Sequence, residues 1–241
     1  MNQYKSFSFV PKFRLAIPSG ETRDSISDFA FTLDCVAFLF SHWIPQLKDK
    51  PLTVTFHLDD PMCHRESNTI FLNCETTSWV QAAYQFSHEL CHLSIPMAVC
   101  PPLRWLEESI CEAASLYILP KMTLLWKSLN IKTRTADGDL YLDVFEQYAA
   151  NISSEVIQFD MKDAAELSSL EKDCYCREKN RYIALKLLPI FEECPDFWAA
   201  VPALCQVQES HSLRSSLHQW QASSETPLHR PFHQVFDLFV D

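Results

Sequence analysis

The chain has 241 residues, of which 47% are hydrophobic and 21% are charged, and its formal net charge at pH 7 is -11. This composition excludes a disordered or collagen-like chain, and the length suits one domain or two tightly joined halves. The acidic excess argues against a nucleic-acid-binding protein, which needs a basic face, and against docking on anionic lipid. We therefore expect a globular protein with neither a nucleic-acid nor a membrane partner.

We also expect a cytoplasmic protein. The first residues lack the continuous apolar core of a signal peptide, and the most apolar stretch, residues 29–44, is interrupted by polar side chains. That stretch is also shorter than the roughly 20 residues that span a bilayer. The ten cysteines are scattered along the chain, several of them in apolar helical patterns. Because a protein that is not exported keeps its thiols reduced, we expect buried free thiols and no disulfides.

The first 75 residues are predicted to combine short strands with one helix. Two short strands are expected at residues 6–10 and 14–17, and residues 29–43 are long enough, and free enough of alternation, for a largely buried helix. Residues 52–58 alternate with period two and are rich in β-branched side chains, which indicates a strand. Residues 69–73 are predicted to form a second, shorter strand.

From Ser78 onward the pattern is helical. Ser78 is a plausible N-cap for a helix over 79–95, and a further helix over 104–119 is predicted to end at Pro120. The polar stretch 132–139 is the expected exposed loop. Later helices are predicted at 144–152, 164–173, 181–193, 197–207, 213–220 and 232–239. The chain is therefore expected to be α+β, with a small N-terminal mixed sheet followed by a mainly helical C-terminal half.

One motif carries specific chemistry. His88, Glu89 and His92 form the pattern H-E-x-x-H inside a segment predicted to be helical on other grounds. At 3.6 residues per turn the two histidines lie about 40° apart and one turn along the axis, so both imidazoles can bind one zinc ion. Glu89 is rotated about 100° from His88, which places it beside the metal, where it can take a proton from water.

A catalytic zinc needs a third protein ligand and an open position. Glu108 and Glu112 lie four residues apart, and hence on one face of the next predicted helix. Carboxylates on so apolar a helix are costly unless a cation or hydrogen-bond donors compensate them. Glu107 is a rival third ligand by spacing alone, but it points about 100° away from Glu108.

Residues 88–92, followed by Trp105-Leu106-Glu107-Glu108-Ser109-Ile110-Cys111-Glu112, resemble the gluzincin metallopeptidases, the thermolysin-like and aminopeptidase-like superfamily. Their second motif commonly has the form Trp-Leu-x-Glu-Gly-x-x-Glu, so Ser109 stands here in place of the usual glycine. The resemblance implies that Glu108 is the third zinc ligand. It also implies that Glu112 orients a zinc-binding histidine, because such an acceptor fixes the tautomer of the imidazole.

The resemblance implies further roles outside the two motifs. Residues 69–73 are similar to the family's edge strand, whose Phe71 and Asn73 would bind an extended substrate backbone by strand addition. A tyrosine or histidine of the later helices often hydrogen-bonds the developing oxyanion in such proteins. Tyr182 is the first candidate for this role, with Tyr175 and His211 behind it, although Tyr182 is equally well explained as a core aromatic residue.

The sequence thus predicts a single zincin-like domain over 1–241, with a strand-rich part at 1–75, the zinc helices at 78–120 and a helical part at 140–241. Its expected function is zinc-dependent hydrolysis, and the resemblance implies a metallopeptidase that cleaves peptide bonds in a peptide or protein substrate with Glu89 as the general base. The alternative is a non-catalytic or regulatory metal-binding module that retains the peptidase fold.

Overall fold

The computed structural model describes residues 3–57, 59–129, 143–154, 156–224 and 228–240. The predicted loop at 132–139 lies outside these residues. Contacts within the chain divide it into two compact units, the first comprising Met1–Leu93 and Ser115–Ser154 and the second Ser94–Ala114 and Glu155–Asp241. Neither unit is a continuous segment, because one long helix, α3 (Arg104–Ser128), begins in the second unit and ends in the first.

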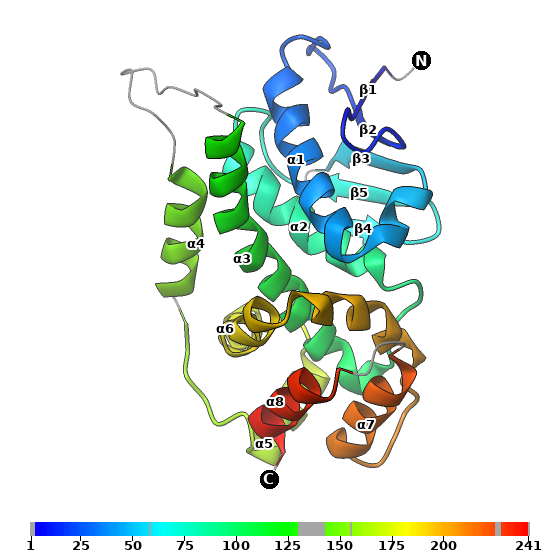
Figure 1. The fold of residues 1–241 in the computed structure, drawn as a ribbon, viewed down its shortest axis with the longest axis vertical. Helices are drawn as coiled ribbons and strands as arrows, with labels where there is room; N and C mark the ends of the chain where they lie inside the picture. The colour runs from blue at the N-terminus through cyan, green and yellow to red at the C-terminus, as the bar shows by residue number, and fades with distance from the viewer. Residues whose placement is uncertain (1–2, 58, 130–142, 155, 225–227, 241) are drawn as a thin grey trace. The chain divides into compact units, whose positions relative to one another are not determined.

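The first unit contains a five-stranded sheet (Figure 1). Its strands, in the spatial order β1-β2-β3-β5-β4, are β1 (Tyr4–Ser6), β2 (Phe13–Ala16), β3 (Leu52–Phe56), β5 (Thr69–Leu72) and β4 (Met62–His64). The three central strands are parallel, and β1 and β4 pair antiparallel with their neighbours. This mixed sheet at the N-terminus, followed by helices, confirms the predicted α+β class.

The expectation that residues 69–73 form an edge strand is wrong. β5 pairs with β3 on one side and with β4 on the other, so its backbone groups are already used in the sheet. The outer strand is β4, only three residues long, which the sequence analysis missed because it lies between two turns. Asn68, in the turn before β5, has a φ of 45°, a left-handed conformation that asparagine tolerates better than most residues.

One face of the sheet is packed and the other is partly open. Leu52 and Val54 of β3 and Ile70 and Leu72 of β5 are buried, as the period of two requires. Helix α1 (Ser27–Trp43) contributes Phe29, whose ring centroid lies 5.5 Å from that of Phe56. The remaining helical elements of this unit are η1 (Pro45–Asp49), α2 (Trp79–Ser94) and α4 (Val144–Ser154).

Residues 7–12 form a turn rather than the predicted strand at 6–10, because a buried carboxylate binds their backbone. Asp34 of α1 is 2% exposed, and its oxygens accept hydrogen bonds from the N–H groups of Ser8, Phe9 and Val10. These donors compensate the carboxylate for its burial. The carboxylate of Asp34 therefore fixes the backbone of the turn to α1, and the ring of Phe9 adds contacts with Phe31 and Phe38 of the same helix.

Replacing Asp34 by alanine is expected to lower the free energy of unfolding by about 3 kcal/mol, since several N–H groups would lose their charged acceptor. Urea denaturation measures this loss. Asp24, an exposed residue before α1, is the control: Asp24→Ala should change the free energy of unfolding by less than about 0.5 kcal/mol. Equal losses in the two variants would contradict the assignment of Asp34 as the anchor of the turn.

Two helix predictions need correction. Helix α3 does not end at Pro120 but continues to Ser128, and its extension buries Met122 and Trp126, so apolar burial outweighs the hydrogen bond that the proline lacks. The segment predicted as a helix at 197–207 is the 3-10 helix η3 (Pro195–Gln206), which contains a second proline at Pro202. The other helices lie where they were predicted, with ends that differ by up to a few residues.

The second unit is built from helices around an aromatic core. The ring of Phe191 stacks on Phe197 and Trp198, and the indole N–H of Trp220 donates to the carbonyl of Ala200 at 2.8 Å. Besides η3 and the first part of α3, the helices of this unit are η2 (Pro101–Leu103), α5 (Ala164–Lys172), α6 (Arg177–Glu193), α7 (Leu213–Ser223) and α8 (His229–Phe239).

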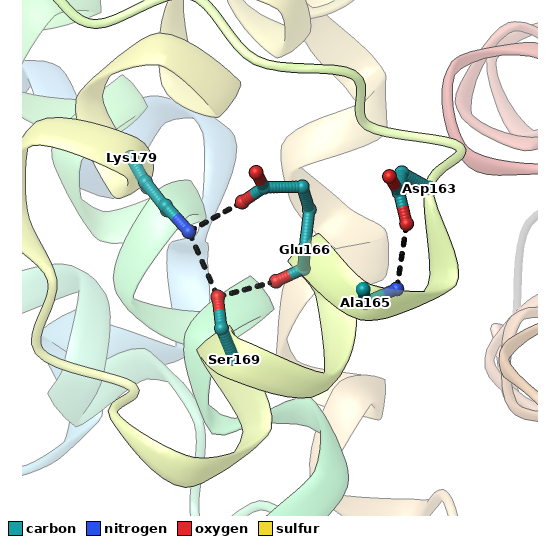
Figure 2. A network of polar contacts seen from close by, with 5 residues as sticks. All are labelled: Asp163, Ala165, Glu166, Ser169 and Lys179. Carbon is teal, nitrogen blue, oxygen red and sulfur yellow. Dashed lines mark hydrogen bonds and ion pairs between the residues drawn. The ribbon is translucent and has the colours of Figure 1, made fainter.

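A polar network joins α5 to the first turn of α6 (Figure 2). Asp163 caps α5 by accepting a hydrogen bond from the N–H of Ala165 at 2.7 Å. Lys179 of α6 forms an ion pair with the carboxylate of Glu166 and donates to the hydroxyl of Ser169 at 2.8 Å. The start of α6 is thereby fixed within this unit.

Among the described residues, every helix is too short or too polar to cross a membrane.

Candidate metal centre

The two motif histidines lie side by side on α2. The imidazole centroids of His88 and His92 are 5.0 Å apart, with an angle of 61° between the ring planes. His92 is 9% exposed and Glu89 6% exposed, while His88 is half-buried. The predicted helix is present, and its spacing brings the two nitrogen donors together as the motif requires.

Helix α2 is fastened to the end of β5. The N–H of Asn73 donates to the side-chain oxygen of Gln85 at 3.0 Å, and the side-chain amide of Gln85 donates back to the carbonyl of Asn73 at 3.0 Å. Gln81, one turn earlier, donates to the same carbonyl. The backbone of Asn73 therefore positions α2, and its predicted contact with a substrate would have to come from its side chain.

Phe71, the other predicted substrate residue, lies on the partly open face of the sheet. Its ring is flanked edge-on by the imidazoles of His57 and His64, at centroid distances of 5.9 and 6.0 Å. Phe71 is half-buried in this aromatic row. Its role in substrate binding stays a prediction.

One face of α3 carries several polar side chains at helical spacing. Glu108, Cys111, Glu112 and Ser115 recur at intervals of three and four residues, so they follow one another along the helix. Within the first unit, the hydroxyl of Ser115 donates to the backbone carbonyl of Tyr84 at 2.9 Å.

In the described part of the chain, His88, His92 and Cys111 each offer one atom that could bind a metal ion. The two histidines belong to the first unit and Cys111 to the second. Nitrogen and sulfur atoms are the donors that zinc prefers. Cys111 was not among the predicted ligands, although its position three residues after Glu108 and four before Ser115 is a signal that could have identified it.

Glu112 forms a buried ion pair. The Nε of Arg181 in α6 donates to Oε1 of Glu112 at 2.8 Å, and the two side chains are 11% and 5% exposed. A buried carboxylate needs such a partner, because its desolvation is otherwise uncompensated. Arg181 was not predicted from the sequence, since nothing in the pattern of α6 distinguishes a buried arginine from a surface one.

A second polar contact joins α3 and α6 one turn away. The fully buried hydroxyl of Ser109 shares its hydrogen between the carbonyl of Trp105 at 2.7 Å and the side-chain oxygen of Asn180 at 3.4 Å. The amide of Asn180 donates to the carbonyl of Cys174 at 2.7 Å. The buried hydroxyl of Ser109 thus has hydrogen-bond partners inside the unit.

The carboxylate of Glu108 is near the turn that precedes α6. Burial raises the pKa of the Cys174 thiol, and the negative charge of Glu108 raises it further. Glu108 is half-buried, whereas its rival Glu107 is 6% exposed. Burial does not distinguish the two carboxylates as the third ligand. The direction in which they point from α3 differs by about 100°, and the predicted ligand is Glu108.

The side chain of Tyr182 packs against residues other than the motifs. Its ring lies 5.3 Å from that of Phe159, and the ammonium of Lys186 lies 5.2 Å from its centroid. The reserve candidates Tyr175 and His211 are exposed. A role for any of the three in stabilising an oxyanion stays a prediction.

No protein-family model, no curated protein and no solved structure matches this chain.

Proposed function

We propose that this protein is a zinc-dependent hydrolase of gluzincin type, a metallopeptidase that cleaves peptide bonds. The observation that carries the proposal is the pair of adjacent imidazoles on α2, with the buried carboxylate of Glu89 between them in the sequence. The donor chemistry of these residues fits zinc. A buried glutamate next to two imidazoles is costly unless it serves a site of this kind or is otherwise paired.

His88, His92 and Glu108 would hold the ion. Zinc, when bound, would lower the pKa of a water molecule and polarise the carbonyl of the peptide bond that is cleaved. Glu89 acts as the general base that takes the proton of the attacking water and then passes it to the leaving amine. Glu112 accepts a hydrogen bond from a zinc-binding histidine and so fixes its tautomer. Tyr182 would donate to the oxyanion.

The substrate class proposed is a peptide or protein in extended conformation. Since β5 is an inner strand, an added strand would pair with β4, the outer strand of the described sheet, and Phe71 would contact substrate side chains on the partly open face. We further propose a cytoplasmic location, in which the ten free cysteines stay reduced.

One observation favours a second candidate, the metal-binding module without catalysis. If the sulfur of Cys111 joins the two imidazoles and Glu108, the ion has four protein ligands. Such closed sites are structural, whereas catalytic zinc sites keep one position open for water. The identity of the third ligand therefore separates the two functions.

Metal analysis combined with a peptidase assay tests the proposal. Purified protein is expected to contain one zinc per chain and to cleave members of a mixed peptide pool, and removal of the metal by a chelator should abolish the cleavage. His92→Ala should lose both zinc and activity, whereas His229→Ala, at the exposed start of α8, should keep both. Zinc without cleavage of any peptide would support the non-catalytic module, and absence of zinc would refute both candidates.

A further inference from the structure

We propose that Arg181 is a positioning residue of the candidate metal centre, an inference that rests on the proposed function. Its guanidinium would hold Glu112 in the orientation that supports a zinc-binding histidine. The contact between the two side chains is direct, 2.8 Å from Nε to Oε1, and both are almost completely buried. Arginine and glutamate side chains are rarely buried to this extent unless they are paired.

The charge of Arg181 is suited to this position. Glu108 and Glu112 lie one helical turn apart on the same face of α3, where two carboxylates repel each other. The guanidinium that pairs with Glu112 offsets this repulsion. Because arginine stays protonated at any pH that a folded protein experiences, the compensation is permanent.

The start of α6 is fixed by the two residues that precede Arg181. Asn180 connects it to Ser109 and to the carbonyl of Cys174, and Lys179 connects it to α5 through Glu166 (Figure 2). The guanidinium is consequently presented to Glu112 from a constrained helix end. Such rigidity is what a positioning residue needs, since a metal ligand must be held within a fraction of an ångström.

An ion pair that only stabilises the fold would show the same contact. The experiment must therefore distinguish stabilisation of the fold from positioning of the metal centre. Zinc affinity is measured by competition with a chromophoric chelator in Arg181→Met, which removes the charge and keeps an apolar chain, and in Arg181→Lys, which keeps the charge. Arg181→Met is expected to raise the Kd for zinc by about 10- to 100-fold, the usual cost of losing an outer partner of a metal ligand. Arg181→Lys should recover part of the affinity.

Lys179→Met is the matched control. It is the same kind of change two residues earlier on α6, and it breaks the ion pair with Glu166 instead. This variant is expected to bind zinc with the wild-type Kd, whatever stability it loses in urea. The visible spectrum of Co²⁺, which reports ligand geometry, should change in Arg181→Met and stay unchanged in Lys179→Met.

The outcomes distinguish this inference from the proposed function. If wild-type protein binds zinc and Arg181→Met binds it with the same Kd and the same Co²⁺ spectrum, the positioning role is refuted and the metal centre stands. If wild-type protein binds no metal, the proposed function fails and the inference fails with it. Should Arg181→Met not fold, Arg181→Gln, which keeps a neutral donor, replaces it with the same expected and contradicting results.

Discussion

Substitution of Glu89 by glutamine is expected to reduce peptide hydrolysis by about 10²- to 10⁴-fold, the usual contribution of a general base. Glutamine has the same size and fits the same buried position, but its neutral amide does not accept the proton of the attacking water. The variant should therefore retain one zinc per chain and the wild-type free energy of unfolding. The measurement is kcat/KM on a cleaved peptide, together with the zinc content.

Glu66→Gln provides the control for this experiment, because Glu66 is an exposed residue of the same unit in the turn between β4 and β5. It should leave kcat/KM unchanged. A wild-type rate in Glu89→Gln would show that the assigned base is wrong. Loss of zinc in that variant would instead place Glu89 among the ligands or their supports.

Removal of the third ligand is the second change with a large expected effect. Glu108→Ala should raise the Kd for zinc by more than about 100-fold, since loss of an outer partner alone costs about 10- to 100-fold. Cys111→Ser is expected to keep the wild-type affinity, because the ligands of the proposed catalytic centre are His88, His92 and Glu108. Both are measured by competition with a chelator.

The Co²⁺-substituted protein gives an independent measurement of the same point. A thiolate ligand produces an intense sulfur-to-cobalt charge-transfer band in the near ultraviolet, and a centre of two imidazoles and a carboxylate does not. We expect the band to be absent from wild-type protein. A band that disappears in Cys111→Ser would identify the thiol as a ligand, contradict the assignment of Glu108 as the third protein ligand, and favour the non-catalytic module.

A comparison of Glu107→Ala with Glu108→Ala tests which of these two neighbouring carboxylates of α3 is the third ligand. Glu107→Ala removes a carboxylate that is more deeply buried, yet points to another side of α3. It should affect stability more than zinc affinity. The reverse result, a large loss of affinity in Glu107→Ala and a small one in Glu108→Ala, would exchange their roles.

Local sequence patterns were sufficient to predict the α+β class, the strands of the sheet core and the helical spacing of His88 and His92. These features depend on periodicity and on the geometry of one element, and both can be obtained from neighbouring residues. The predictions were wrong where residues far apart in the sequence determine the local structure. Asp34 binds the turn at residues 7–12, and burial of Met122 and Trp126 carries α3 past Pro120.

The candidate zinc-binding residues of α2 could be predicted from the H-E-x-x-H spacing alone, because a helix places positions i and i+4 on one face whatever surrounds it. The position of β5 inside the sheet and the pairing of Glu112 with Arg181 became known only from the folded chain. Strand order and partners from another helix depend on how segments far apart in the chain pack. A single sequence carries no local signal for that packing.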